Sequence, residues 1–322
     1  MSKSHTPWMG RRHFLVTAAA GALAVGGGTI TPARPGQANT RTILKSANLE
    51  VLVMSDGYFV LPTGFLVDPE VPKSESEAVL KAAGQGGEQL QLPNNVTVIR
   101  KGSDVILVDT GSGPHHQPSA GKLAENLRAA GIQPAAITKV VLTHGHPDHL
   151  WGVLDADDNL IYPNAIYFVS AKELNVWADP DVLRNLPAVF PKELAAGVAK
   201  GAKNHISRIR DKVMMVREDD EIVSGVRAID TPGHTPGHIS VEVAGGDGFV
   251  IVGDALTHPL ISFQYPSWRV PVDHEADRGI ATRLRLLDQL ATDRRRLIGA
   301  HLPFPGSGLV ERKGGAYRFV AS

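Results

Sequence analysis

Residues 138–152 read TKVVLTHGHPDHLWG and carry four metal-capable side chains in six positions. The apolar run before them predicts a buried strand that ends on His144. His144 and His146 alternate along this extended segment, so their rings project from the same edge, whereas Asp148 and His149 begin a predicted short helix. A mononuclear zinc site with three protein ligands needs fewer residues than this. The surplus therefore predicts two adjacent metal ions.

Three further candidate ligands each follow an apolar run and a glycine or other small residue. They are His234 in DTPGHTPGH, Asp254 in FVIVGDA and His301 in RLIGAH. A small residue at such a place lets the backbone come close to an ion. Because binding sites gather on the loops at one edge of a layered fold, we expect these three side chains to complete the metal site.

The amino-acid composition restricts which metals and which partners the protein can bind. The 322-residue chain has no cysteine, so nitrogen and oxygen must supply every metal ligand. Zinc fits such a donor set best, and two Zn²⁺ ions per chain are expected, with Mn²⁺, Co²⁺ and Fe²⁺ compatible. Lys plus Arg and Asp plus Glu number 33 each. Because the charges balance, the chain has no net positive charge to attract nucleic acid, and a small-molecule substrate is expected.

Residues 1–38 resemble a twin-arginine export signal. The paired Arg11 and Arg12 precede a weakly apolar, Ala- and Gly-rich stretch that is too short for a membrane span. Cleavage is expected after Ala38, which leaves one domain at 39–322 and predicts a periplasmic or secreted protein without stable membrane insertion. The alternative is an uncleaved amphipathic anchor.

The remaining chain alternates between predicted strands and helices. LEVLVMSDGYFVLP predicts two strands around an Asp56-Gly57 turn, and residues 94–111 predict a second hairpin that turns at Gly102-Ser103. Helices are expected around 119–131, 191–210 and 274–293. Residues 66–92 predict a partly helical insertion that covers a pocket or forms a homodimer. The pattern predicts two sheets with helices outside, in an α/β or α+β layering.

The seven candidate ligands, taken in order, resemble those of the metallo-β-lactamase superfamily, and the similarity runs from about residue 48 to the C-terminus. The resemblance implies an α+β fold, an αββα sandwich of two mixed sheets packed face to face with helices outside. It also implies how the ligands divide. One metal is held by His144, His146 and His234, the other by Asp148, His149 and His301, and Asp254 bridges the two.

A narrower resemblance is to the methyl parathion hydrolase group of exported phosphotriesterases, lactonases and aryl esterases. It is carried by MSDGYFVLP, LVDTG, THGHPDH, GHTPGH, GDA and the ending AHLPFPG…YRFV. Histidine at 146, where the superfamily's diiron oxygen-reducing branch usually has glutamate, favours hydrolysis over redox chemistry. Aspartate at 254, where many β-lactamases have cysteine, disfavours antibiotic hydrolysis.

The expected reaction is hydrolysis by hydroxide shared between two metals, whose charge lowers the pKa of water from ~15.7 towards ~7. The hydroxide would attack a lactone or aryl ester carbonyl or the phosphorus of a phosphotriester, and Asp148 or Asp254 would relay the proton. No G-x-S-x-G motif provides a protein nucleophile. Two alternatives stay open: a thioesterase of the glyoxalase II kind, and a non-catalytic metal-binding protein of the same fold.

The substrate pocket is expected to be apolar, although ordinary core packing explains each of its candidate residues equally well. The candidates are Phe65, Leu66, Trp177, Phe190, Leu256 and His258. For the remaining histidines the roles differ. We expect His238 to support the site from behind. His115 and His116 lie on a loop expected to face the same edge, where substrate contact is the less favoured alternative to a structural role. His205 and His274 are expected to be structural.

Overall fold

The computed structural model describes residues 41–46, 49–245 and 248–322. The predicted export signal and its cleavage site at Ala38 lie outside these residues. The chain from Asn39 to Ser322 forms one compact unit. Among the described residues, no helix combines the length and the apolar character that crossing a bilayer requires.

The first sheet has seven strands, which lie side by side in sequence order from β1 to β7. Its first four strands pair antiparallel and the remaining neighbours pair parallel, so the sheet is mixed. The strands are β1 (Arg41–Ser46), β2 (Leu49–Pro62), β3 (Gln89–Lys101), β4 (Asp104–Val108), β5 (Lys139–Leu142), β6 (Ile166–Ser170) and β7 (Val213–Val216).

The second sheet also has seven strands, in the order β14 to β8. Only β11 and β12 pair parallel in it, and the other neighbours are antiparallel. The strands are β8 (Glu221–Val223), β9 (Val226–Asp230), β10 (Ile239–Val243), β11 (Phe249–Ile251), β12 (Arg296–Ile298), β13 (Ser307–Lys313) and β14 (Ala316–Ala321).

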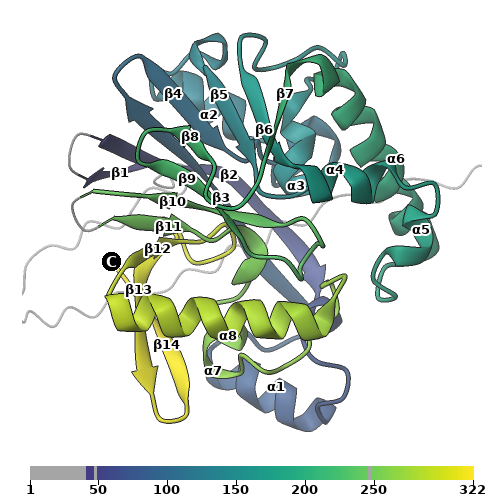
Figure 1. Ribbon diagram of the computed structural model, residues 1–322. Coiled ribbons are helices and arrows are strands. Elements are labelled where there is room, and N and C mark those ends of the chain that lie inside the picture. Colours follow the sequence, from purple (N-terminus) through teal and green to yellow (C-terminus); the bar gives the residue numbers. More distant parts are fainter. Residues whose placement is uncertain (1–40, 47–48, 246–247) are drawn as a thin grey trace, which may run out of the picture. The chain divides into compact units, whose positions relative to one another are not determined.

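Helices cover the outer faces of both sheets: α2, α4 and α6 lie beside the first sheet and α8 runs along the second (Figure 1). The α-helices are α1 (Lys73–Ala82), α2 (Leu123–Ala129), α3 (Pro147–Leu150), α4 (Ala171–Ala178), α5 (Val182–Asn185), α6 (Lys192–Ile209), α7 (Ile261–Gln264) and α8 (Ala276–Asp293). Short 3₁₀ helices are η1 (Thr63–Phe65), η2 (Gly113–His115), η3 (Pro134–Ala136), η4 (Trp151–Val153), η5 (Arg210–Lys212) and η6 (Gly253–Ala255).

Successive side chains of a strand point to opposite faces of its sheet, so the core consists of separate layers. In β5, Val140 packs in the cluster that includes the helices α2 and α6, whereas its neighbour Val141 packs between the sheets with Val241 of β10. This is the two-faced burial expected of a central strand, and each fully buried Val or Ile contributes about 1.5–3 kcal/mol. The structure confirms the αββα sandwich predicted from the sequence.

The Asp56-Gly57 turn prediction was wrong, because residues 49–62 form a single bent strand, β2. The pairing of β2 with β3 shifts at a bulge between Ser55 and Gly57. Gly57 has φ of 108°, and a Cβ there would lie 2.1 Å from the Ser119 carbonyl oxygen. The buried Asp56 carboxylate accepts backbone N–H groups of Ser112 and Leu123, both at 2.9 Å. The pair therefore bends a strand and ties it to the loop that follows β4.

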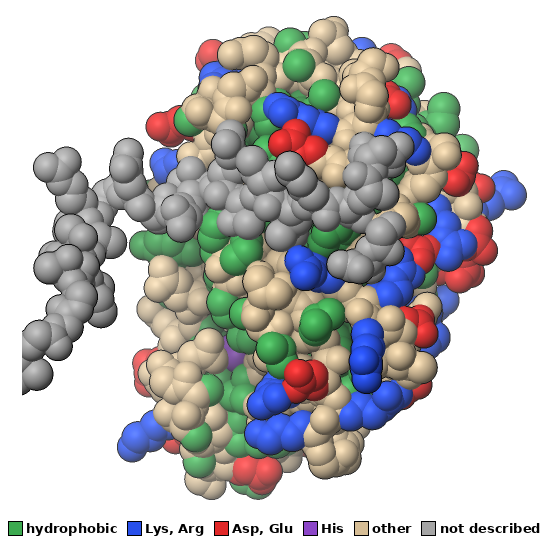
Figure 2. Space-filling model, turned by 90° about the vertical axis from the view of Figure 1, so that its left-hand side faces the viewer, with side chains coloured by type: hydrophobic (Ala, Val, Ile, Leu, Met, Phe, Trp, Pro, Cys, Tyr) green, Lys and Arg blue, Asp and Glu red, His purple; other side chains and the backbone are tan. Residues whose placement is uncertain are grey.

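The 66–92 insertion is partly helical, as predicted, but its last residues belong to β3. Leu80 of α1 is buried in one apolar cluster with Phe65, Leu66 and Val272 of the same chain. The insertion thus packs against its own domain, and a homodimer remains a prediction. Figure 2 shows lysine, arginine and acidic side chains interspersed over one face of the molecule, with hydrophobic side chains between them.

Candidate metal centre

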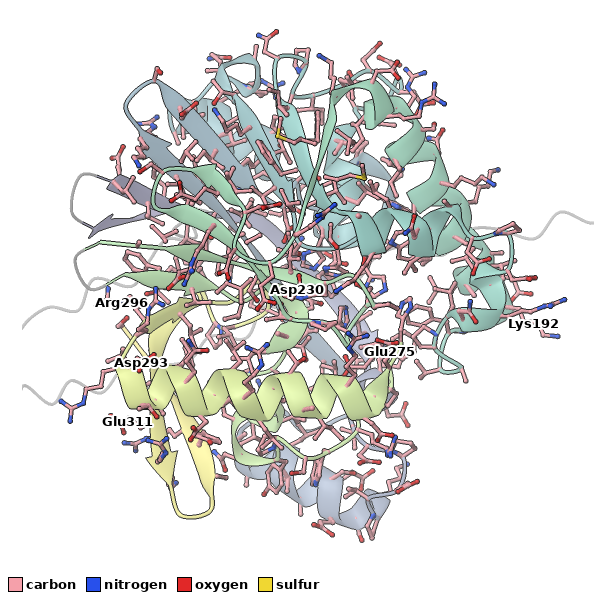
Figure 3. The ribbon with its side chains drawn as sticks, in the orientation of Figure 1. Lys192, Asp230, Glu275, Asp293, Arg296 and Glu311 are labelled. Carbon is pink, nitrogen blue, oxygen red and sulfur yellow. The ribbon has the colours of Figure 1, made fainter. Side chains whose placement is uncertain are left out.

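The seven predicted ligands come from connections that follow strands β5, β9, β11 and β12. The structure brings them together: their side chains form buried groups whose potential ligand atoms lie within 4.8 Å of one another. In Figure 3 the label Asp230 marks the last residue of β9, four residues before His234 in the chain. The first ligand group is His144, His146 and His234, and the second ligand group is Asp148, His149 and His301.

In the first ligand group, three imidazole nitrogens converge. His146 Nδ1 lies 3.0 Å from His144 Nε2 and 2.9 Å from His234 Nε2. In the second ligand group, Asp148 Oδ2 lies 3.1 Å from His149 Nε2 and 3.3 Å from His301 Nε2. Each group therefore presents three donor atoms to one point, which is the number a catalytic zinc receives from protein.

Asp254 faces both ligand groups. Its Oδ1 lies 3.2 Å from His149 Nε2 and 3.1 Å from His301 Nε2, whereas its Oδ2 lies 3.3 Å from His234 Nε2. One carboxylate oxygen is thus directed at each group. This is the geometry that a bridging carboxylate between two cations requires.

Two of these atoms test whether the residues fit a metal. His149 Nε2 and Asp254 Oδ1 are buried and make no hydrogen bond to any described residue. The two atoms lie 3.2 Å apart. Buried polar atoms in folded proteins are almost always paired. A cation between the ligand groups satisfies both atoms, and the nitrogen and oxygen donors suit zinc.

The ionisation states of Asp254 and His144 favour the binding of a cation. Burial raises the pKa of Asp254, but the surrounding histidines, His301 first, hold this pKa well below its ordinary value, so the carboxylate is ionised. Burial and neighbouring imidazoles lower the pKa of His144, which keeps it neutral. Burial also lowers the pKa of His301, but Asp254 and Asp148 raise it to about 10. A metal at the second ligand group must displace this proton.

Hydrogen bonds from behind orient the ligand rings. His149 Nδ1 lies 2.8 Å from Asp109 Oδ2, and His234 Nδ1 lies 3.0 Å from Asp273 Oδ1. His301 Nδ1 donates to the carbonyl oxygen of Pro93 at 2.9 Å. In each case the outer nitrogen is occupied and the inner nitrogen is left for a metal, an arrangement that metal sites use to fix the ligand tautomer.

Glu173 of α4 joins the two loops that carry the first ligand group. Its Oε1 accepts the backbone N–H of Gly145 at 2.8 Å and the indole N–H of Trp177 at 2.7 Å. Its Oε2 accepts the hydroxyl of Thr235 at 2.6 Å. The sequence analysis missed Glu173, because a glutamate on a predicted helix is ordinarily solvent-exposed and nothing in AKELNVW marks it as buried.

A cavity of about 350 Å³ opens over both ligand groups. Two expected pocket residues, Phe65 and Phe190, line it, as does Leu66. The other lining residues are mainly apolar and include five of the ligands: Phe59, Val60, Leu61, Pro62, Leu92, His116, Gln117, His146, Pro147, Asp148, Pro191, Leu194, Val198, His234, Asp254, Thr257, Val272 and His301.

Three expected pocket residues do not line the cavity. Trp177 is 1% exposed and turns its indole N–H to Glu173, behind the ring of His146. Leu256 packs in the cluster under α8. His258 Nδ1 accepts the backbone N–H groups of Leu260 and Ile261 and so binds the start of α7. For Leu256 and His258, a sequence position near Asp254 did not determine which way the side chain points.

The remaining histidines divide in a partly unexpected way. His238 Nε2 accepts the backbone N–H of Asp254 at 3.0 Å and so supports the bridging residue, and His205 stacks on Trp151. His274, expected to be structural, instead lies against a ligand, with its Nε2 3.1 Å from Nε2 of His146. His116 lines the cavity, whereas its neighbour His115 does not.

Comparison with known proteins agrees with this geometry. Residues 90–301 match the metallo-beta-lactamase superfamily, and the chain belongs to that family. The probable metallo-hydrolase YflN of Bacillus subtilis (strain 168) is 30% identical over 207 residues, which are 59% of this chain and 71% of YflN.

Two solved structures share the fold over almost their whole length. The dizinc quorum-quenching lactonase AidC, in complex with a product, N-hexanoyl-L-homoserine, superposes with a TM-score of 0.82 at 26% identity, covering 88% of this chain and 97% of AidC. The hydrolase AbOPH of the beta-lactamase superfamily superposes with a TM-score of 0.80 at 27% identity, covering 89% and 98%. The chain is therefore a metallo-hydrolase of this superfamily.

Proposed function

We propose that the protein is a dinuclear zinc hydrolase of lactones or aryl esters, with phosphotriesters as further substrates. The observation that carries this proposal is the Asp254 carboxylate, which lies between two groups of three ligands at the floor of an apolar cavity. The similarity to AidC, a dizinc lactonase, supports both the metal and the substrate class. The methyl parathion hydrolase group remains the proposed subfamily.

Zinc held by the two ligand groups and Asp254 would supply a nucleophile at neutral pH and Lewis acidity towards the substrate oxygen. The chain's own residues provide the rest. Phe65, Leu66 and Phe190 exclude water and hold the apolar part of the substrate next to the ligand groups. Asp148 borders the cavity, and its surrounding histidines hold its pKa well below the ordinary value against the effect of burial. The lowered pKa keeps this carboxylate, like that of Asp254, ionised and available as a metal ligand, and we propose that one of the two relays the proton released at the reacting centre.

The residues that line the cavity favour neutral over anionic substrates. Of the residues that border it, only metal-ligand candidates carry carboxylates, and none is a lysine or an arginine. A neutral acyl or aryl group fits this lining, whereas the anionic tail of a glutathione thioester finds no cationic partner there. The lactonase proposal is therefore preferred over a glyoxalase II-like thioesterase.

The proposal is tested with purified protein whose bound metals are counted in parallel with activity. The substrates are a lactone, an aryl ester, a paraoxon-type triester and a glutathione thioester. We expect two zinc ions per chain and turnover of the lactone or the aryl ester, lost on chelation and restored by zinc. Turnover of the thioester alone would support the thioesterase, and two metals with no turnover at all would support a non-catalytic metal-binding protein.

We also propose that the protein is exported to the periplasm or secreted by the twin-arginine route, on the basis of Arg11 and Arg12. Folded export suits a protein that acquires its metals before it leaves the cytoplasm. Replacing both arginines by lysine should leave the protein inside the cell. Unchanged export of that variant would contradict the proposal.

A further inference from the structure

Asp273, which supports the ligand His234, is itself held by a buried arginine of α8. Asp273 Oδ1 lies 3.0 Å from His234 Nδ1, and Asp273 Oδ2 accepts a hydrogen bond from Nη2 of Arg283 at 3.0 Å. Both side chains of this ion pair are only 3% exposed. One carboxylate oxygen therefore faces the ligand ring, and the other faces the arginine.

The guanidinium of Arg283 is also fixed by the backbone of a neighbouring loop. Its Nη1 donates to the carbonyl oxygens of Pro266 and Trp268, both at 2.9 Å. Because a guanidinium is planar and its donors have fixed directions, few orientations can satisfy a carboxylate and two carbonyl groups together. Arg283 therefore presents Nη2 to Asp273 in a defined direction.

Helix α8 lies very close to the loop that carries His234. A Cβ at Gly279, in the first turn of the helix, would lie 2.6 Å from Asp273 Oδ2. One turn later, the Thr282 hydroxyl donates to the carbonyl oxygen of Pro232 at 2.6 Å. The start of α8 thus packs directly against both Asp273 and the ligand loop, and it brings its arginine to the carboxylate.

Asp273 also borders a second cavity, of about 550 Å³, which shares no lining residue with the apolar cavity. Its polar lining residues are Asp179, Arg184, Asn185, Asp273, His274 and Glu275. A cavity of this size and polarity can hold water. A carboxylate that is free to rotate could turn from His234 to that water, whereas Arg283 holds Oδ2 and so keeps Oδ1 on the ligand ring.

The second ligand group is supported from the first sheet. Asp109, which follows β4 and supports His149, accepts the backbone N–H of Thr143 at 2.7 Å and its hydroxyl at 2.9 Å. His301 is supported by the carbonyl oxygen of Pro93 in β3. Helix α8 instead packs on the outer face of the second sheet (Figure 1). The support that α8 provides is therefore directed to the first ligand group.

We propose that Arg283 is a positioning residue for zinc at the first ligand group, because it holds Asp273 in the orientation that fixes the direction and the tautomer of His234. The inference rests on the dinuclear zinc centre of the proposed function. Arg283 acts through Asp273 and is not itself a ligand. Without it, the first ligand group should bind zinc less tightly, and the second ligand group should keep its affinity.

The test measures zinc occupancy separately at the two ligand groups. Crystals of the wild-type protein and of each variant are equilibrated with free zinc that a chelator sets, and the anomalous peaks at the zinc edge give the two occupancies. We expect Arg283→Met to weaken zinc binding about 10–100-fold at the first ligand group and less than about threefold at the second. Arg283→Lys, which keeps the charge but not the planar fork, should lie between Arg283→Met and the wild type. The matched control is Arg285→Met, an exposed arginine of α8 that donates to the Asp230 carbonyl oxygen, and it should change neither affinity.

A double variant tests whether Arg283 acts through the carboxylate. Asp273→Ala alone should weaken zinc binding at the first ligand group, and adding Arg283→Met should weaken it no further. A merely structural role of Arg283 would instead add its own loss to that of Asp273→Ala. Urea unfolding curves show whether each variant is folded. If Arg283→Met does not fold, Arg283→Lys makes the same comparison, and a loss confined to the first ligand group is again required.

Equal losses at both ligand groups, no loss at either, or a further loss in the double variant would overturn the inference and leave the dinuclear centre intact. A wild-type protein that binds no zinc at the first ligand group would overturn the proposed centre, and the inference with it.

Discussion

Replacing Glu173 by alanine should damage the metal centre through its loops rather than through a ligand. The change removes the acceptor for two buried N–H groups, those of Gly145 and Trp177, and for the Thr235 hydroxyl. A buried donor left unsatisfied costs about 1–3 kcal/mol. The hydroxyl can rotate to another partner, so the two N–H groups dominate. We expect Glu173→Ala to lower the free energy of unfolding by about 3 kcal/mol.

Glu173→Gln separates this explanation from a simple loss of charge. Both N–H groups donate to the same oxygen, Oε1, which the glutamine amide oxygen can replace. The Thr235 hydroxyl can accept from the new amide NH₂ in place of donating to Oε2. Burial raises the pKa of Glu173, so a neutral side chain is tolerated there. Glu173→Gln should therefore stay within about 1 kcal/mol of the wild-type stability.

Urea unfolding and zinc competition with a chelator measure the two effects. We expect Glu173→Ala to weaken zinc binding about 10–100-fold, as loss of outer support typically does, and Glu173→Gln to bind zinc nearly as the wild type does. The control is Glu218→Gln at an exposed glutamate, which should change neither quantity. Equal behaviour of the alanine and glutamine variants would refute the reasoning.

Three further predictions concern pH dependence, the bridge and the loop. Burial lowers the pKa of His258 from 6.5 to about 4, so the folded state binds fewer protons than the unfolded state and stability is lost as pH falls from about 6.5 to 4. Between pH 7 and pH 4, the free energy of unfolding of His258→Gln should therefore fall about 3 kcal/mol less than that of the wild type, as measured by unfolding curves. A variant with the same pH dependence as the wild type would show that His258 does not cause this loss. Asp254→Asn should reduce the bound metal below two ions per chain and lower kcat/KM at least about 100-fold. A variant that keeps two metals and full activity would show that Asp254 does not bridge them. Gly145→Ala places a Cβ 2.2 Å from Trp177 Nε1 and should lower the free energy of unfolding by about 1–3 kcal/mol. The control is Gly64→Ala, whose Cβ meets open space and should not lower it. Equal stabilities of the two variants would exclude the clash.

The alternation of strands and helices predicted the layered fold, and the resemblance of the seven candidate ligands to those of the metallo-β-lactamase superfamily implied the αββα sandwich. The convergence of these ligands could be predicted because it depends on local signals. Each ligand follows an apolar strand, and the ends of such strands meet at one edge of the sandwich. The spacing of His144, His146, Asp148 and His149 is short enough to fix their relative placement without knowledge of the rest of the chain.

What the sequence could not predict depends on side-chain direction and on distant partners. Trp177 was expected in the pocket, but Glu173 on the preceding helical turn binds its indole N–H and turns the ring behind His146. Asp56-Gly57 has the composition of a turn, yet the buried carboxylate is committed to the loop after β4 and keeps the strand continuous. His274 approaches His146 from 128 residues away, a contact that no local pattern indicates.

The most direct test of the account is a crystal of zinc-loaded protein measured at the zinc absorption edge. The account predicts two anomalous peaks per chain. One should lie among His144, His146 and His234 and the other among Asp148, His149 and His301, with the Asp254 carboxylate between them. A single peak, or two peaks that Asp254 does not join, would contradict the dinuclear centre.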